Sequence, residues 1–129
     1  MKKIINFLND LFANKAKPVA EKRIVLIVDF QKLSIDERIS QIIFCGDSAD
    51  VHYLPLLKYA IVSDPEKDVK MAALKRIHLF ASHPDTSPFI KELAQHMKVS
   101  TVEPYYSMAL SKLNIISVKE FKERASKWI

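Results

Sequence analysis

Residues 64–80 read DPEKDVKMAALKRIHLF, and they predict a helix with unusually small side chains in its middle. The stretch opens on Asp64 and Pro65, which suit a helix start because aspartate caps free N–H groups and proline has no N–H to leave unpaired. Larger apolar residues then recur at helical spacing. The adjacent Ala72 and Ala73 predict that a second helix approaches this one closely, with larger side chains filling the space around the contact.

Four further places in the chain carry the signals of a helix N-terminus. Three match the capping box, in which a serine accepts a backbone N–H bond and a glutamate bonds back. They are Ser34 with Glu37, Ser100 with Glu103 and Ser117 with Glu120. Ser87 followed by Pro88 repeats the pattern of Asp64 and Pro65. The single glycine, Gly46, argues against tight β-hairpins, which rely on Asn-Gly or Asp-Gly turns. These signals together predict an all-α chain.

The apolar stripes of the predicted helices recur with a spacing of 36 residues. Leu54, Leu57 and Ile61 correspond to Ile90, Leu93 and Met97, and Val69, Ala73, Leu74 and Ile77 correspond to Tyr105, Ala109, Leu110 and Leu113. A weaker copy at Ile39, Ile42, Ile43 and Phe44 lies 30 residues before Val69, Ala72, Ala73 and Leu74. Because each stripe needs a neighbour to cover it, the sequence predicts helical hairpins that stack on one another.

The stretch IVLIVDF, residues 24–30, fits this pattern least well. Taken alone it is typical of a buried strand, because it is rich in β-branched residues. No second such run exists to pair with it, and a lone strand would leave its backbone groups unsatisfied. We therefore expect a hydrophobic helix over residues 19–32, with a strand as the alternative that the sequence leaves open.

DPEKDVKMAALKRI resembles the inner-helix signature of HEAT-like repeats, with an acidic turn, Val69 and Lys70, and then the alanine pair. YLPLLKYAI resembles the outer helix of such a repeat, including a mid-helix proline at Pro55. The resemblance covers residues 20–113 and departs from the family at Pro104 and Met108. The spacings of 30 and 36 residues are also shorter than the ~40–47 residues of typical units. The resemblance implies a right-handed α-α superhelix, an α-solenoid of about three helical hairpins.

We expect the 129 residues to form one domain, because a chain of this length buries a single core. Its predicted parts are an N-terminal amphipathic helix with a linker (1–18), three hairpins (19–113) and a C-terminal capping helix (114–129). The apolar stripes of the end helices are Ile4, Phe7, Leu8, Leu11 and Phe12, and Val118, Phe121, Ala125 and Trp128. End helices with one polar face suit a stacked array. The lysines near the N-terminus leave open that the first helix instead lies on a membrane or binds a partner.

No catalytic, cofactor or metal site is predicted. The four histidines lack the spacing of metal ligands, and one glycine is too few for a phosphate-binding loop. Cys45 lies in the apolar run IIFC and is expected to be a buried thiol. We therefore predict that the chain is not an enzyme and has no small-molecule substrate. A lone cysteine and the absence of a signal-peptide pattern indicate the cytoplasm.

The net charge of +5 is a first indication of nucleic-acid binding, but the charge is unevenly distributed. Residues 1–23 hold six basic and two acidic side chains, and residues 98–129 hold six and three. Residues 24–97 hold eight basic and ten acidic side chains. The positive charge thus belongs to the ends of the chain, which makes nucleic-acid binding an alternative rather than the leading prediction.

Proteins that this chain resembles mostly act as binding scaffolds whose inner helices line a concave face. The resemblance therefore implies a non-enzymatic protein–protein interaction module that binds a protein or peptide, acidic in character, on that face. The candidate partner-binding residues, chosen because exposed Arg, Lys and Tyr side chains anchor acidic partners, are Arg38, Lys70, Lys75, Tyr105, Tyr106 and Lys112. Two alternatives stay open: a nucleic-acid-binding helical-repeat protein, and an immunity-type or regulatory inhibitor of a single protein partner.

Overall fold

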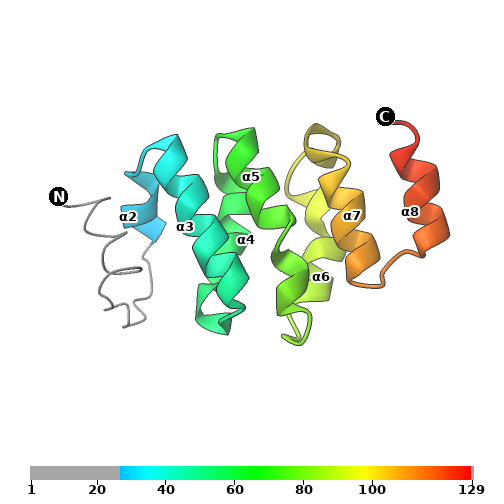
Figure 1. The fold of residues 1–129 in the computed structure, drawn as a ribbon, viewed down its shortest axis with the longest axis horizontal. Coiled ribbons are helices and arrows are strands. Elements are labelled where there is room, and N and C mark those ends of the chain that lie inside the picture. Colours follow the sequence, from blue (N-terminus) through cyan, green and yellow to red (C-terminus); the bar gives the residue numbers. More distant parts are fainter. Residues whose placement is uncertain (1–26, 129) are drawn as a thin grey trace.

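The computed structural model describes residues 27–128, and every regular element within them is helical (Figure 1). The α-helices are α2 (Ile27–Gln31), α3 (Ile35–Ser48), α4 (Leu54–Ser63), α5 (Lys67–Leu74), α6 (Thr86–Lys91), α7 (Tyr105–Lys112) and α8 (Val118–Ala125). Short 3-10 segments are η2 (Val51–Tyr53), η3 (Ile77–Phe80), η4 (Leu93–Gln95) and η5 (Val99–Val102). The predicted all-α class is therefore confirmed for these residues.

Two predicted helices extend beyond the described part of the chain. The N-terminal helix of residues 1–18 lies outside it, and so does most of the helix expected over residues 19–32. The described end of that second helix, α2, is helical and not a strand. Among residues 27–128, no helix is both long enough and apolar enough to cross a membrane.

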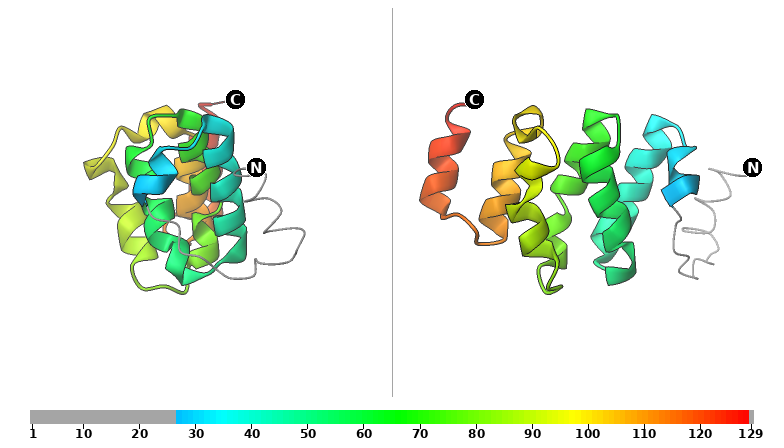
Figure 2. Two further views of the ribbon diagram at one scale, coloured as in Figure 1. Left: turned by 90° about the vertical axis from the view of Figure 1, so that its left-hand side faces the viewer. Right: turned by 180° about the vertical axis from the view of Figure 1, so that it is seen from behind.

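The helices follow one another along the long axis of the molecule in two layers. Figure 1 shows α3, α5 and α7 side by side, with α4 and α6 in the layer behind them, and the turned views of Figure 2 show the same row from its end and from the rear. α4 packs against α5, α6 packs against α7, and α5 lies between α3 and α7. α8 closes the row against α7.

Most of the positions that the repeat spacing relates belong to the core. Leu54 and Leu57 are buried, as are their counterparts Ile90 and Leu93, whereas Ile61 is buried but its counterpart Met97 is half-buried. In the second set, both members are buried in the pairs Ala73 with Ala109 and Leu74 with Leu110. Val69 and Ile77 are also buried, but their counterparts Tyr105 and Leu113 are half-buried. The predicted equivalence of the two hairpins therefore holds for the burial of most of these residues.

Two of the predicted capping serines cap helices as expected. Ser34 accepts from the backbone N–H of Glu37, whose side chain accepts from the N–H of Ser34, so the capping box of α3 is complete. Ser117 accepts from the N–H of Glu120 at the start of α8. These short-range signals succeed because the cap and its partner are three residues apart and need no tertiary contact.

The other predicted helix starts and the predicted mid-helix proline are wrong in detail. α5 begins at Lys67 rather than at Pro65, Ser87 lies inside α6, and Ser100 lies inside η5. Pro55 lies in the first turn of α4 and not in its middle, because η2 precedes it.

The helix predicted across residues 64–80 is interrupted after Leu74 by a turn, and η3 follows. Arg76 lies in this turn and donates from Nη1 to the carbonyl oxygen of Ala72, 2.9 Å away, which satisfies one of the last carbonyls of α5. Its Nε donates to Asp47 Oδ1 at 3.1 Å, across to α3. A contact with the neighbouring helix thus accompanies the break, which no local signal indicates.

Gly46 lets α3 and the α5–η3 turn approach each other. A Cβ at this position would lie 2.8 Å from Cβ and 2.7 Å from Cδ of Arg76, which is closer than carbon atoms pack. Cβ belongs to the rigid start of the Arg76 side chain, so rotation of the outer side chain would not relieve both contacts. The single glycine of the chain therefore serves close packing within a helix.

We predict that Gly46→Ala destabilises the protein, although alanine is the better helix former. Alanine gains about 1 kcal/mol of helix propensity, but overpacking against Arg76 costs about 1–3 kcal/mol, so we expect a net loss of about 1 kcal/mol in the free energy of unfolding. Urea denaturation measures this loss. Ser40→Ala, at an exposed position of the same helix, is the matched control and should not destabilise. A Gly46→Ala variant as stable as this control would contradict the close contact.

Candidate interaction surface

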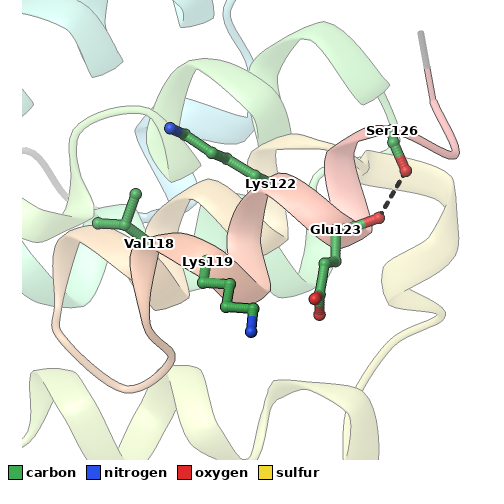
Figure 3. Close-up of a pocket in the computed structure, with 5 residues that line it drawn as sticks. All are labelled: Val118, Lys119, Lys122, Glu123 and Ser126. Atoms are coloured by element: carbon green, nitrogen blue, oxygen red, sulfur yellow. Dashed lines mark hydrogen bonds between the residues drawn. The ribbon is translucent and has the colours of Figure 1, made fainter.

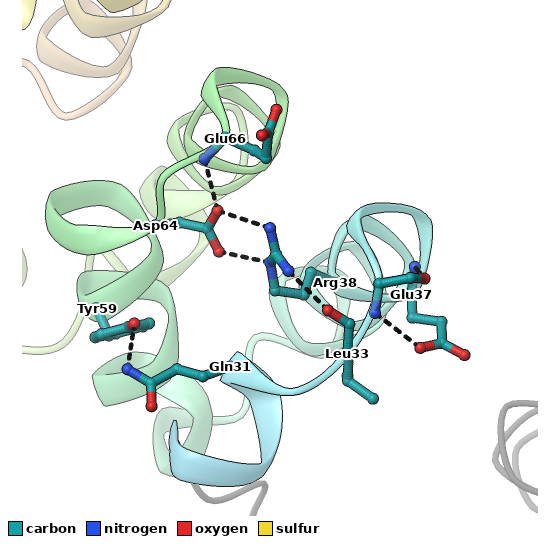
Figure 4. A network of polar contacts seen from close by, with 8 residues as sticks. Gln31, Leu33, Glu37, Arg38, Tyr59, Asp64 and Glu66 are labelled. Carbon is teal, nitrogen blue, oxygen red and sulfur yellow. Dashed lines mark hydrogen bonds and ion pairs between the residues drawn. The ribbon is translucent and has the colours of Figure 1, made fainter.

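Arg38 is buried, with 8% of its surface exposed, and its guanidinium faces the interior. Nε donates to Asp64 Oδ2 at 2.9 Å, Nη2 donates to Asp64 Oδ1 at 3.3 Å, and Nη1 donates to the carbonyl oxygen of Leu33 at 2.7 Å (Figure 4). The expectation that Arg38 is an exposed anchor for a partner is therefore wrong. The buried carboxylate of Asp64 holds the guanidinium, and its distance of 26 residues along the chain hid it from local sequence patterns.

The carboxylate of Asp64 is itself almost fully buried and joins three segments. It binds Arg38 of α3, and its Oδ1 also accepts from the backbone N–H of Glu66 at 2.9 Å, which shapes the turn between α4 and α5. Arg38 in turn holds the carbonyl of Leu33 in the turn between α2 and α3. Nearby, Gln31 donates to the hydroxyl of Tyr59 at 2.7 Å (Figure 4). Polar contacts therefore join the first hairpin, α2 with α3, to the second, α4 with α5.

We predict that Arg38→Ala or Asp64→Ala alone lowers the free energy of unfolding by about 3–5 kcal/mol, because each leaves the other charge buried without its partner. Chemical denaturation of each variant measures the loss.

The exposed ion pair between Arg76 and Asp47 provides the control for this prediction. The Asp47 side chain is 61% exposed, so Asp47→Ala should cost less than about 1 kcal/mol. If Arg38→Ala cost no more than Asp47→Ala, the buried pair would not hold the hairpins together.

Lys70 is half-buried and caps the end of α4. Its Nζ donates to the carbonyl oxygens of Ile61 and Val62, each at 3.0 Å, in the last turn of that helix. Burial lowers the pKa of the Lys70 ammonium, and the nearby carboxylate of Asp64 opposes this shift. Two of the three N–H donors are thus used inside the protein, which reduces the role of Lys70 as a partner-binding residue.

Tyr106 is buried, with 8% of its surface exposed, so the expectation that it is an exposed anchor is also wrong. Burial raises the pKa of its hydroxyl, the charge of Arg124 opposes this shift, and Glu103 adds to it. Arg124 belongs to α8, which packs against α7. Arg124 of the helix that follows thus acts on Tyr106, an effect that no pattern within α7 indicates.

Lys75, Tyr105 and Lys112 remain accessible, and the structure brings them to one junction between α5 and α7. The Nζ of Lys75 lies 5.2 Å from the ring centroid of Tyr105, which is a cation–π contact. Lys112 follows Tyr105 by seven residues on α7, so both lie on the same face two turns apart. Lys75 and Lys112 are exposed and Tyr105 is half-buried.

His78 lies at the same junction and was not among the predicted site residues. Burial lowers the pKa of its imidazole, and the charge of Lys112 lowers it further, while the nearby backbone of Lys75 opposes the shift. Its Nδ1 is buried and has no hydrogen-bond partner among the described residues. The one signal that could have found it is its position three residues after Lys75, on the same side of a helical segment. We call Lys75, His78, Tyr105 and Lys112 the basic–aromatic cluster.

The lysines of this cluster have no acidic partner in the part of the chain that the structure describes. The ion pairs found there involve Arg38, Arg76, Arg124, His52 and His83. Lys112 lies close enough to His78 to lower its pKa, and no described carboxylate forms an ion pair with either lysine. Because like charges at short range disfavour each other, such a junction favours an incoming anionic group.

Other groups offer little chemistry. The thiol of Cys45 is fully buried, and burial raises its pKa to about 12, with the charge of Asp50 as a smaller cause, so it is a poor nucleophile. Within residues 27–128, no three His, Cys, Asp or Glu side chains gather as metal ligands would. A shallow hollow on α8 is lined by Val118, Lys119, Lys122, Glu123 and Ser126 (Figure 3). All five come from one short stretch of chain, so no second element encloses a ligand there.

Comparison of the chain with protein-family models, with curated proteins and with solved structures found no match.

We predict that His78 makes stability depend on pH. Its folded-state pKa is lower than the ordinary value of about 6.5 that it has when unfolded, so below that pH the unfolded chain binds a proton that the folded protein resists. The free energy of unfolding should therefore fall as the pH is lowered from about 7.5 through 6.5, until the pH lies below the folded-state pKa.

Urea denaturation of the parent and of His78→Gln, at a pH of about 7.5 and again at a pH below 6.5, checks the prediction. The variant should lose less stability over the range than the parent protein. His96→Gln, at an exposed position, is the matched control and should keep the parent's pH dependence. Equal pH dependence in the parent and His78→Gln would contradict the assignment.

Proposed function

We propose that the chain is a HEAT-like helical-repeat protein, an α-solenoid of stacked hairpins in a right-handed superhelix, that binds an acidic segment of another protein. The row of helices in two layers supports the stacked arrangement (Figure 1). The matching burial of residues 36 apart in successive hairpins supports a repeat. Neighbouring inner helices of such a repeat present side chains from equivalent positions to a single surface.

The observation that carries the binding proposal is the basic–aromatic cluster. Lys75 is the residue that directly follows α5, and Tyr105 and Lys112 come from α7, so the site lies where two helices meet. The cation–π contact fixes Lys75 relative to Tyr105, which lowers the entropy lost when a partner binds. Ammonium and phenol groups are donors that recognise carboxylates, and these residue types anchor protein interfaces well.

The extent of the positive charge favours a protein partner over nucleic acid. Residues 27–128 hold 14 basic and 13 acidic side chains, a net charge of only +1 (14 − 13). Binding to a phosphate backbone draws on several cations arranged along a groove. The basic–aromatic cluster instead concentrates two lysines at one junction, which matches a short acidic segment.

The double variant Lys75→Glu/Lys112→Glu tests this function. We expect it to weaken binding of a specific partner about 100-fold, because each reversal replaces an attraction with a repulsion at the centre of the site. Tagged parent and variant proteins are used to capture partners from the native lysate, and titration of the captured partner then gives the affinities.

The rear layer offers a closely matched control. Lys58 of α4 lies over the ring of Phe89 at 5.3 Å, nearly the geometry of Lys75 over Tyr105. Lys58→Glu/Lys91→Glu makes the same change in net charge away from the proposed site and should leave binding unchanged. Equal binding by both double variants would contradict the proposed surface. If the parent protein captures nucleic acid at low salt and both double variants lose this capture equally, the partner would be a nucleic acid and not a protein.

A further inference from the structure

Both ends of the helix row expose apolar side chains, but their polar neighbours differ. At the C-terminal end, Val118 and Trp128 are exposed beside the lysines Lys119 and Lys122 (Figure 3). At the N-terminal end, α2 and the start of α3 expose Ile27, Val28 and Ile35, which are 37%, 53% and 42% exposed. We call these three residues the N-terminal apolar patch. Exposed apolar side chains gathered at the end of a stacked array mark a face that another element covers.

Acidic side chains border the N-terminal apolar patch. Asp29 follows Val28, and Asp36 follows Ile35, and both are exposed. Between residues 27 and 37 the basic side chain is Lys32 alone, against Asp29, Asp36 and Glu37. The element that covers this end should therefore combine an apolar face with positive charge.

We infer that residues 4–12 of the same chain dock on the N-terminal apolar patch. Their apolar residues recur at helical spacing, at Ile4, Phe7, Leu8, Leu11 and Phe12. The lysines around them, Lys2, Lys3, Lys15 and Lys17, complement the acidic border, against Asp10 as the acidic residue among positions 1–18. The segment thus has both properties that the patch requires.

The covalent connection makes this contact effective. Residues 13–18 link the apolar stripe to the predicted first helix, and six extended residues reach about 20 Å, more than the ~10 Å between the axes of packed helices. A tether of this length raises the effective concentration of the segment to the millimolar range. Weak apolar contacts then suffice to keep the end of the array covered.

The acidic border also separates this occupant from two others. An anionic membrane would be repelled by Asp29 and Asp36. A second copy docked patch to patch would bring the same acidic borders together. The docked segment of the same chain meets neither obstacle.

Hydrogen exchange of the full chain, followed by mass spectrometry, tests the inference. We expect the amides of residues 5–12 to exchange about tenfold or more slowly than in an unstructured peptide. Val28→Glu/Ile35→Glu changes only exposed side chains, so residues 27–128 should stay folded and protected, while residues 5–12 should exchange within about twofold of the unstructured rate. Val118→Glu, 63% exposed at the opposite end, is the control and should leave residues 5–12 protected.

Four results would overturn the docking. Residues 5–12 could exchange at the unstructured rate in the parent protein, or stay equally protected in Val28→Glu/Ile35→Glu. Protection could rise with protein concentration while the protein sediments as a dimer, which would make a second copy the occupant. Protection that arises only with vesicles containing phosphatidylserine would assign the segment to a membrane.

Discussion

The buried ion pair between Arg38 and Asp64 is the contact on which the relation between the first two hairpins depends. A guanidinium and a carboxylate withdrawn from water need each other and every remaining hydrogen bond, because either charge alone would be strongly disfavoured. The third contact of Arg38, to Leu33, and the second contact of Asp64, to Glu66, meet that need. This ion pair therefore fixes helix α3 together with the turn before it and the turn between α4 and α5.

Small residues in α3 and α5 let these helices pack closely against their neighbours. Ala73 is fully buried in α5, and Gly46 allows α3 to approach Arg76 where α5 ends. Close backbone approach increases the number of favourable dispersion contacts made by the larger neighbours Leu57, Ile61 and Leu74. Arg76 lies in the turn that follows α5, where it donates to the carbonyl oxygen of Ala72 and to the carboxylate of Asp47.

The proposed binding surface is what remains of the basic and aromatic side chains after the fold has used its share. Arg38 and Lys70 bind groups within the protein, and Tyr106 is buried. Lys75, Tyr105 and Lys112 project from the junction of α5 and α7, where His78 joins them. Because the described part of the chain supplies no carboxylate to these lysines, the junction favours an acidic partner.

The sequence by itself determined the all-α class, the correspondence of buried positions 36 apart, and the caps at Ser34 and Ser117, because these depend on periodicity and on partners within one turn. It also singled out Lys75, Tyr105 and Lys112. Only the tertiary structure decided which candidates stay accessible, since Asp64 lies 26 residues from Arg38 and Arg124 lies 18 residues from Tyr106 (124 − 106). Burial and ion pairing depend on contacts between helices, and local patterns carry no record of them.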